Sequence, residues 1–368
     1  MRNLFFVHTP VQMLIAQQLI HQENYEHNVL LYGYIDSNKH FIDIYNILKI
    51  DNLWEQTIYF PNLPACADLT LRRPLSCFRD IIYNIKKLDS ILHAYNIDNI
   101  FLGDIDNIGY QFLMFYYKNK VCINVYEEGT SHYTYKNRIP HKRRFQKIQQ
   151  YLLDNLFYRP CFGLKFAKYW YREGDYDHLP IDNRWSIVPG YNNEIYDKRL
   201  TITLDFLSDK VREYLSDEIK YVKSKQNIVL LITSKVYEHQ DKKLLQERYD
   251  AYLNTINDFI SDVSKDATII IKLHPREGED VADDIKRIAQ KYKLDTYFLS
   301  KKINIPVEIY LQILKPSEMN VFCNSSGMYN GYMYPKCKIN DLIYSFFEHC
   351  EYSNIFVDDL KKLYKGLI

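Results

Sequence analysis

The sequence of 368 residues lacks long hydrophobic runs and carries a net charge of only +1. No stretch approaches the roughly 20 apolar residues that a membrane-spanning helix needs. The segment that begins MRNLFFVH reaches a polar residue too early for a signal peptide. Proteins that bind nucleic acid usually carry a basic face, which the overall charge gives no reason to expect. We therefore expect a cytoplasmic protein with no nucleic-acid partner.

Patterns typical of metal ligands are also missing. The seven cysteines form no CxxC pair and show no zinc-type spacing, so we expect them to be reduced. No DxD-type pair of carboxylates with supporting ligands follows a predicted strand. The sequence therefore predicts no metal site and no bound cofactor.

Short apolar runs alternate with longer segments of helical periodicity, which is typical of parallel sheets covered by helices. Strands are predicted at 3–7, 28–34, 99–102 and 121–125, and in a second series at 227–233, 267–273, 296–299 and 320–323. Helices are predicted at 10–21, 78–95 and 242–263, the first with Thr9 as N-cap and Pro10 at the first helical position.

This pattern predicts two α/β halves, residues 1–170 and 226–368, joined by a crossover within 171–225. The region 159–193 is rich in aromatic residues, Pro, Gly and Asn and has no clear period, which is typical of a connection. In such folds ligands bind at the carboxyl ends of the strands. The residues that follow each strand are therefore the candidates for function.

Two adjacent carboxylates, Glu127 and Glu128, follow the predicted strand 121–125 and precede Gly129. A carboxylate held near a hydroxyl group can act as a general base, and glycine lets the backbone turn tightly. The same run is also typical of an ordinary solvated turn.

Three basic residues, Lys272, His274 and Arg276, alternate at the end of the predicted strand 267–273, and Pro275 ends that strand. Phosphate suits such a cluster, and histidine, with an ordinary pKa near 6.5, can donate a proton to a leaving oxygen. An exposed basic turn with a core-packed histidine is the alternative interpretation.

A third candidate site follows the predicted strand 320–323, where Ser325, Ser326 and Gly327 precede a helix-like stretch. Backbone amides and hydroxyls at a helix N-terminus can bind an anion, although the same residues are typical of a plain N-cap. Glu308 begins another predicted helix, where its carboxylate could accept hydrogen bonds from a ribose or favour the helix dipole.

In chain order, Glu127-Glu128-Gly129, His274-Pro275 and Ser325-Ser326 resemble the D/E-D/E-G, HP and S/T-S/T motifs of bacterial sialyltransferases. The run LFFVHTPVQM at 4–13 and the triplet HPR at 274–276 look most like glycosyltransferase family 52, which includes lipooligosaccharide sialyltransferases. Bacterial polysialyltransferases share the three motifs. The resemblance covers nearly the whole chain.

The resemblance implies an α/β fold of the GT-B type, with two Rossmann-like domains facing each other across a cleft. The first domain would face the acceptor, and the second would bind the donor, CMP-sialic acid. Sialic acid would then be transferred with inversion and without a metal.

The resemblance also implies a role for each candidate residue. Glu127 or Glu128 would be the base, and His274 would protonate the departing CMP phosphate. Some family 52 members carry an aspartate base early in the second domain, where this chain has Glu238 as a possible substitute. The residues left for donor binding are Lys272, Pro275, Arg276, Glu308, Ser325, Ser326 and Gly327.

The acceptor implied by the resemblance is a glycan of the lipooligosaccharide or capsule type, expected to end in galactose. Three alternatives stay open: a polysialyltransferase, a family 52 transferase that uses another sugar nucleotide, and a non-catalytic protein that binds glycans or nucleotides. The motifs leave open the linkage and the oligomeric state, for which a homodimer is one option.

Some family members have an N-terminal membrane anchor, which we do not find in this sequence. Attachment to the inner membrane would then be peripheral. The basic stretch 138–147 could contact anionic lipid, and a solvated helix face is the alternative interpretation.

Overall fold

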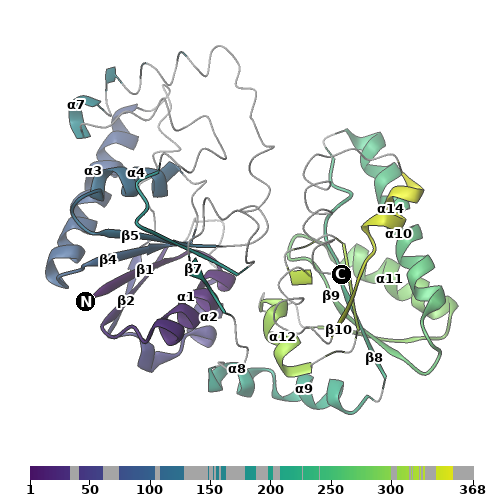
Figure 1. Ribbon diagram of the computed structural model, residues 1–368. Helices are drawn as coiled ribbons and strands as arrows, with labels where there is room; N and C mark the ends of the chain where they lie inside the picture. Colours follow the sequence, from purple (N-terminus) through teal and green to yellow (C-terminus); the bar gives the residue numbers. More distant parts are fainter. Residues whose placement is uncertain are drawn as a thin grey trace. The chain divides into compact units, whose positions relative to one another are not determined.

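Parallel strands with buried side chains form the framework of the computed structural model (Figure 1). The structure describes residues 1–33, 41–60, 74–103, 108–127, 179–187, 198–201, 208–225, 227–239, 241–299, 305–314, 318–322 and 337–350, with shorter pieces within 148–162 and 316–327. The chain divides into two compact units, residues 1–202 and 203–368.

The first unit contains a parallel sheet in the order β3-β2-β1-β4-β5-β6-β7. Its strands are β1 (Asn3–Val7), β2 (Asn28–Gly33), β3 (Gln56–Phe60), β4 (Asn99–Leu102), β5 (Cys122–Tyr126), β6 (Asn183–Ser186) and β7 (Lys198–Arg199). Its helices include α1 (Pro10–Glu23), α2 (Phe41–Leu48), α3 (Pro74–Ala94), α4 (Ile108–Tyr117) and α7 (Arg159–Phe162), with a 3-10 turn η2 (Asp51–Leu53).

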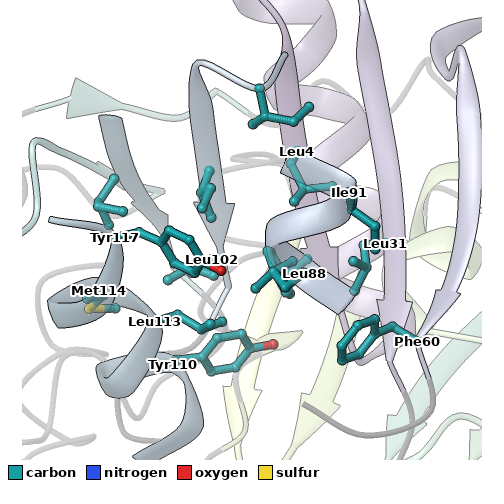
Figure 2. Packing of buried hydrophobic residues seen from close by; sticks show 14 of the residues in the cluster. Leu4, Leu31, Phe60, Leu88, Ile91, Leu102, Tyr110, Leu113, Met114 and Tyr117 are labelled. Atoms are coloured by element: carbon teal, nitrogen blue, oxygen red, sulfur yellow. The ribbon is translucent and has the colours of Figure 1, made fainter. Parts of the chain in front are cut away.

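Helices cover both faces of this sheet. Figure 2 shows Leu88 of α3 and Tyr110 of α4 in one cluster of buried hydrophobic residues that also includes Leu31 of β2. On the other face, the ring of Phe5 stacks on Phe101 with 4.2 Å between the centroids. Because β1 and β2 are buried along their whole length, they are continuous apolar runs rather than alternating ones.

Local signals set the limits of α1 as predicted. The Thr9 side chain accepts a hydrogen bond of 3.2 Å from the Gln12 amide, and Pro10 occupies the first turn. Asn24 ends the helix in the left-handed region at φ 53°.

The second unit contains a parallel sheet in the order β10-β9-β8-β11-β12. Its strands are β8 (Ile228–Ile232), β9 (Thr268–Lys272), β10 (Asp295–Phe298), β11 (Glu318–Val321) and β12 (Lys338–Asp341). Its helices include α8 (Asp209–Tyr214), α9 (Ser216–Lys223), α10 (Lys242–Asp262), α11 (Glu279–Lys291), α12 (Val307–Leu314) and α14 (Ile343–His349). Within this unit, α10, α11 and α14 lie on one side of the sheet and α12 on the other (Figure 1).

The chain divides at a different position from the predicted one. Strands β6 and β7 fall inside the region 171–225 that we expected to be a connection, and they extend the first sheet. Helices α8 and α9 of the same region belong to the second unit. The first unit therefore extends to residue 202 rather than 170.

None of the helices in the described part of the chain is long and apolar enough to cross a bilayer. The basic stretch 138–147 lies outside the described residues. Cys122, Cys337 and Cys350 are free thiols.

Candidate active site

Three strand ends meet at one edge of the second sheet. Strand β8 pairs with β9 on one side and with β11 on the other, so the order of connection reverses next to β8. Ligands of doubly wound folds bind outside the carboxyl ends of the strands at such a reversal. The predicted residues His274 and Ser326 follow two of these three strands.

A tight turn after β9 carries His274. Its backbone amide donates to the Thr233 hydroxyl oxygen over 2.8 Å and to Glu277 Oε2 over 3.0 Å. The Glu277 amide donates back to the His274 carbonyl over 2.9 Å. The Arg276 amide donates to His274 Nδ1 over 3.2 Å, so the proton of the neutral ring lies on Nε2.

The pKa of His274 is lowered from 6.5 to about 4. Burial is the largest cause, since it disfavours the charged ring, and the positive charges of Arg276, Lys235 and Lys272 act in the same direction. The carboxylate of Glu238 opposes them. The ring is therefore neutral at pH 7.

The alternation predicted after β9 has a structural counterpart. Lys272 is the last residue of the strand and is only 7% exposed, whereas the Arg276 side chain is 66% exposed. The two cations therefore stand on either side of His274 in the sequence, one inside the fold and one at the surface. Lys272 interacts electrostatically with Glu308.

Glu308 and Ser326, two of the residues predicted to bind the donor, are hydrogen-bonded to each other. The Ser326 hydroxyl donates to Glu308 Oε1 over 2.8 Å, and Glu308 is 5% exposed. Burial raises the pKa of Glu308, while the hydrogen bond from Ser326 and the charge of Lys272 lower it. The Gly327 amide donates to Asn324 Oδ1 over 2.9 Å, so the Asn324 side chain caps the turn and already occupies this amide. Ser325 lies outside the described residues.

Glu238 lies in the segment that follows β8, close to the histidine turn. Its carboxylate pairs with Arg276 Nη1 at 3.3 Å and with Lys235 Nζ at 3.4 Å. With 51% of its side chain exposed, it is open to solvent, as an acid-base group acting on an acceptor must be.

Glu127 directly follows β5 and is 0% exposed. Its Oε2 accepts the Ile187 amide over 2.5 Å, and its own amide donates to the Trp185 carbonyl over 3.0 Å. The side chain and the backbone of Glu127 thus each form a hydrogen bond that connects the end of β5 to the end of β6. Glu128 and Gly129 lie outside the described residues, so the structure describes one member of this motif.

We expect Glu127→Ala to lower the free energy of unfolding by about 1–3 kcal/mol, because it leaves the buried Ile187 amide without its charged acceptor. Chemical denaturation followed by circular dichroism measures the change. Glu26→Ala, which alters an exposed carboxylate of the same unit, is the control. Unchanged stability together with lost turnover would instead favour Glu127 as the base.

A family model described as alpha-2,8-polysialyltransferase matches residues 3–339. The chain belongs to this family. The match covers nearly the whole chain and includes the three motifs, so the predicted resemblance to bacterial sialyltransferases is confirmed. No curated protein matches the sequence closely enough to count as a relative.

A solved sialyltransferase structure supports the fold of this polysialyltransferase family member. A sialyltransferase from Photobacterium damsela is 15% identical, with 100% of this chain and 80% of that chain covered and a TM-score of 0.51. The ADP-heptose heptosyltransferase II of E. coli is 8% identical, with coverage of 100% and 99% and a TM-score of 0.43. The predicted α/β fold of the GT-B type is confirmed.

Two residues of the site were missed by the sequence analysis of this family member. Thr233 and Glu277 both contact the amide of His274. Thr233 directly follows the first strand of the second sheet, and Glu277 lies three residues after His274, as in many turns closed by a side chain. The position of Thr233 after a strand and the spacing of Glu277 from His274 could have identified the two residues from the sequence.

Proposed function

We propose that the protein transfers sialic acid from CMP-sialic acid to a glycan acceptor with inversion at the anomeric carbon. The observation that carries the proposal is the turn that presents His274 between Lys272 and Arg276, beside the Glu308–Ser326 pair, in a member of the polysialyltransferase family. A turn of this composition is suited to a phosphate leaving group.

In the proposed reaction, the acceptor hydroxyl oxygen attacks the anomeric carbon as the bond from that carbon to the phosphate oxygen of CMP breaks. A carboxylate takes the proton of the acceptor hydroxyl. Arg276 and Lys272 offset the charge that develops on the phosphate. His274, in its protonated form, donates the Nε2 proton to the leaving oxygen and becomes neutral.

The low pKa of His274 is compatible with this role. Without donor, burial and, to a smaller extent, three nearby cations keep the ring neutral. A bound phosphate adds negative charge nearby and raises the pKa, because an opposite charge favours the protonated form. Proton donation would then depend on donor binding.

Glu308 and Ser326 are proposed to bind the nucleotide. A carboxylate can accept hydrogen bonds from ribose hydroxyls, and Ser326 holds the orientation of Glu308 through the 2.8 Å bond. Ser325, Pro275 and Gly327 complete the proposed donor site by their positions in the motifs.

A donor panel tests the proposal. Purified protein is incubated with CMP-sialic acid, UDP-glucose or no donor, together with a galactose-terminated acceptor, and the products are read by mass spectrometry. We expect a sialylated product with CMP-sialic acid alone. Transfer of glucose, or tight binding of CMP without any transfer to several acceptors, would contradict it.

The family match favours a second candidate, in which the acceptor itself ends in sialic acid and the linkage formed is α2,8. An oligosialic acceptor added to the panel separates the two. One added residue indicates single transfer, and a ladder of products indicates polymerisation. A net charge of +1 gives a polyanionic chain no general attraction, so a polymerising enzyme would need a local basic surface.

We further propose a lipooligosaccharide or capsule glycan as the natural acceptor and peripheral contact of the basic stretch 138–147 with the inner membrane. If the protein is cytoplasmic, it can reach such acceptors only at the inner membrane. A homodimer is compatible with the proposal and is not required by it.

We expect transfer to be independent of metal ions, because Lys272 and Arg276 supply the positive charge that a metal otherwise supplies to a leaving phosphate. Chelation by EDTA should change the initial rate by less than about twofold. Dialysed protein without EDTA is the control. Complete loss of activity that magnesium or manganese restores would contradict the prediction.

A further inference from the structure

Glu277 lies beneath the histidine turn and is 7% exposed. One of its carboxylate oxygens accepts the Tyr252 hydroxyl over 3.0 Å. The other accepts both the Thr233 hydroxyl and the His274 amide, the latter over 3.0 Å. Every described contact of this carboxylate is with the fold, so Glu277 is not placed to touch a substrate.

A buried carboxylate is costly unless hydrogen bonds compensate for the lost water. Burial raises the pKa of Glu277, and hydrogen bonds from Thr233, the His274 backbone, Tyr252 and Tyr237 act in the opposite direction. The surrounding wall is aromatic, since the rings of Tyr237 and Tyr252 lie 5.0 Å apart. An apolar side chain at this position would avoid the free-energy cost of burying a carboxylate. The role of Glu277 therefore lies in its hydrogen bonds.

Those contacts fix the backbone on both sides of His274. The His274 amide has two acceptors, Thr233 and Glu277, and its carbonyl accepts the Glu277 amide over 2.9 Å. The turn so closed brings the Arg276 amide to His274 Nδ1 at 3.2 Å. Because that amide can only donate, Nδ1 accepts, and the proton of the neutral ring stays on Nε2.

We propose that Glu277 is a positioning residue, which closes the turn so that the neutral His274 ring keeps its Nε2–H tautomer and directs Nε2, the atom from which the protonated ring donates, toward the leaving phosphate. The proposal rests on the proposed function for its catalytic consequence. The control of the His274 tautomer by Glu277 is a property of the free protein and can be measured without substrate.

Two glutamate variants separate geometry from charge. In Glu277→Gln, the amide oxygen still accepts from Thr233 and His274, while the amide group donates to Tyr252, so turnover should stay within about tenfold of wild type. In Glu277→Ala, the turn loses its closing acceptor, and kcat should fall about 100-fold because the reacting group is misplaced. The KM for CMP-sialic acid should change less than about threefold.

Nuclear magnetic resonance of protein labelled with 15N-histidine reads the tautomer without donor. The His274 signals are assigned as those absent from His274→Asn. We expect the Nε2–H pattern at neutral pH in wild type and Glu277→Gln, and a mixture of both tautomers in Glu277→Ala. Glu279→Gln, an exposed carboxylate two residues further on, should match wild type in tautomer and rate.

Thr233 supplies a second pair of variants in case Glu277→Ala fails to fold. Thr233→Val removes the hydroxyl and should give the mixed tautomers and the lower kcat, whereas Thr233→Ser should restore both. A folded Glu277→Ala or Thr233→Val protein with the wild-type tautomer, or with unchanged kcat, overturns the proposal. A wild-type protein that transfers nothing from CMP-sialic acid contradicts the proposed function and leaves the tautomer measurement valid.

Discussion

Replacement of His274 by alanine is expected to reduce transfer by on the order of 100-fold to 10,000-fold, the usual cost of losing a general acid. The proposed reaction leaves no other proton donor at this turn, since Lys272 and Arg276 contribute mainly charge. The fold should stay intact, because the His274 ring accepts a single hydrogen bond from the described residues, that of the Arg276 amide, and the turn is closed by Glu277 and Thr233. CMP binding should persist.

The test compares kcat/KM for CMP-sialic acid with CMP affinity measured by calorimetry. The pH profile adds a check with a definite sign. Since the pKa of the free enzyme's His274 is about 4 and the charged ring is the proton donor, the descending limb of kcat/KM that reports this acid should begin near pH 4 rather than near the ordinary histidine pKa of 6.5. Wild-type turnover by His274→Ala on the natural donor would exclude the role.

Much of the fold was readable because most of the core strands are continuous apolar runs. Strands β1, β8 and β9 are largely buried and mostly apolar, with runs such as IVLLI and TIIIK, and they begin and end within a residue of the predictions. Strands β6 and β12 were missed, since NRWS and KIND carry polar residues with no period. They become strands by pairing with β5 and β11, which a single sequence does not reveal.

The candidate site was likewise predictable where residue types reveal it and not where pairing between strands determines it. His274 stood out because a strand ended at a proline with basic residues around it. Glu277 and Thr233 were missed because their importance depends on the register of β8 against β9, where Ile232 pairs with Lys272 and brings Thr233 to the turn. Hydrogen bonds across strands leave no mark in the residue types alone.

The acidic residue that acts as base is expected to be Glu128, and Glu128→Gln should reduce transfer by on the order of 100-fold to 10,000-fold while CMP still binds. Glu127 is committed to the Ile187 amide inside the first unit. Successive side chains of an extended chain alternate in direction, so the burial of Glu127 makes Glu128 the member of the pair expected to meet an acceptor. The amide keeps the shape of the side chain and removes only its ability to take a proton.

Glu238→Gln is the matched comparison, because Glu238 is the remaining candidate base, has 51% of its side chain exposed and pairs with Arg276 of the histidine turn. Its carboxylate pairs with Arg276 and Lys235, so its loss should release two cations toward the donor phosphate and change KM for CMP-sialic acid more than kcat. The low-pH limb of the kcat profile, which reports the base, should disappear in Glu128→Gln and stay in place in Glu238→Gln. Full activity of Glu128→Gln combined with lost turnover in Glu238→Gln would move the base to the second unit, beside His274.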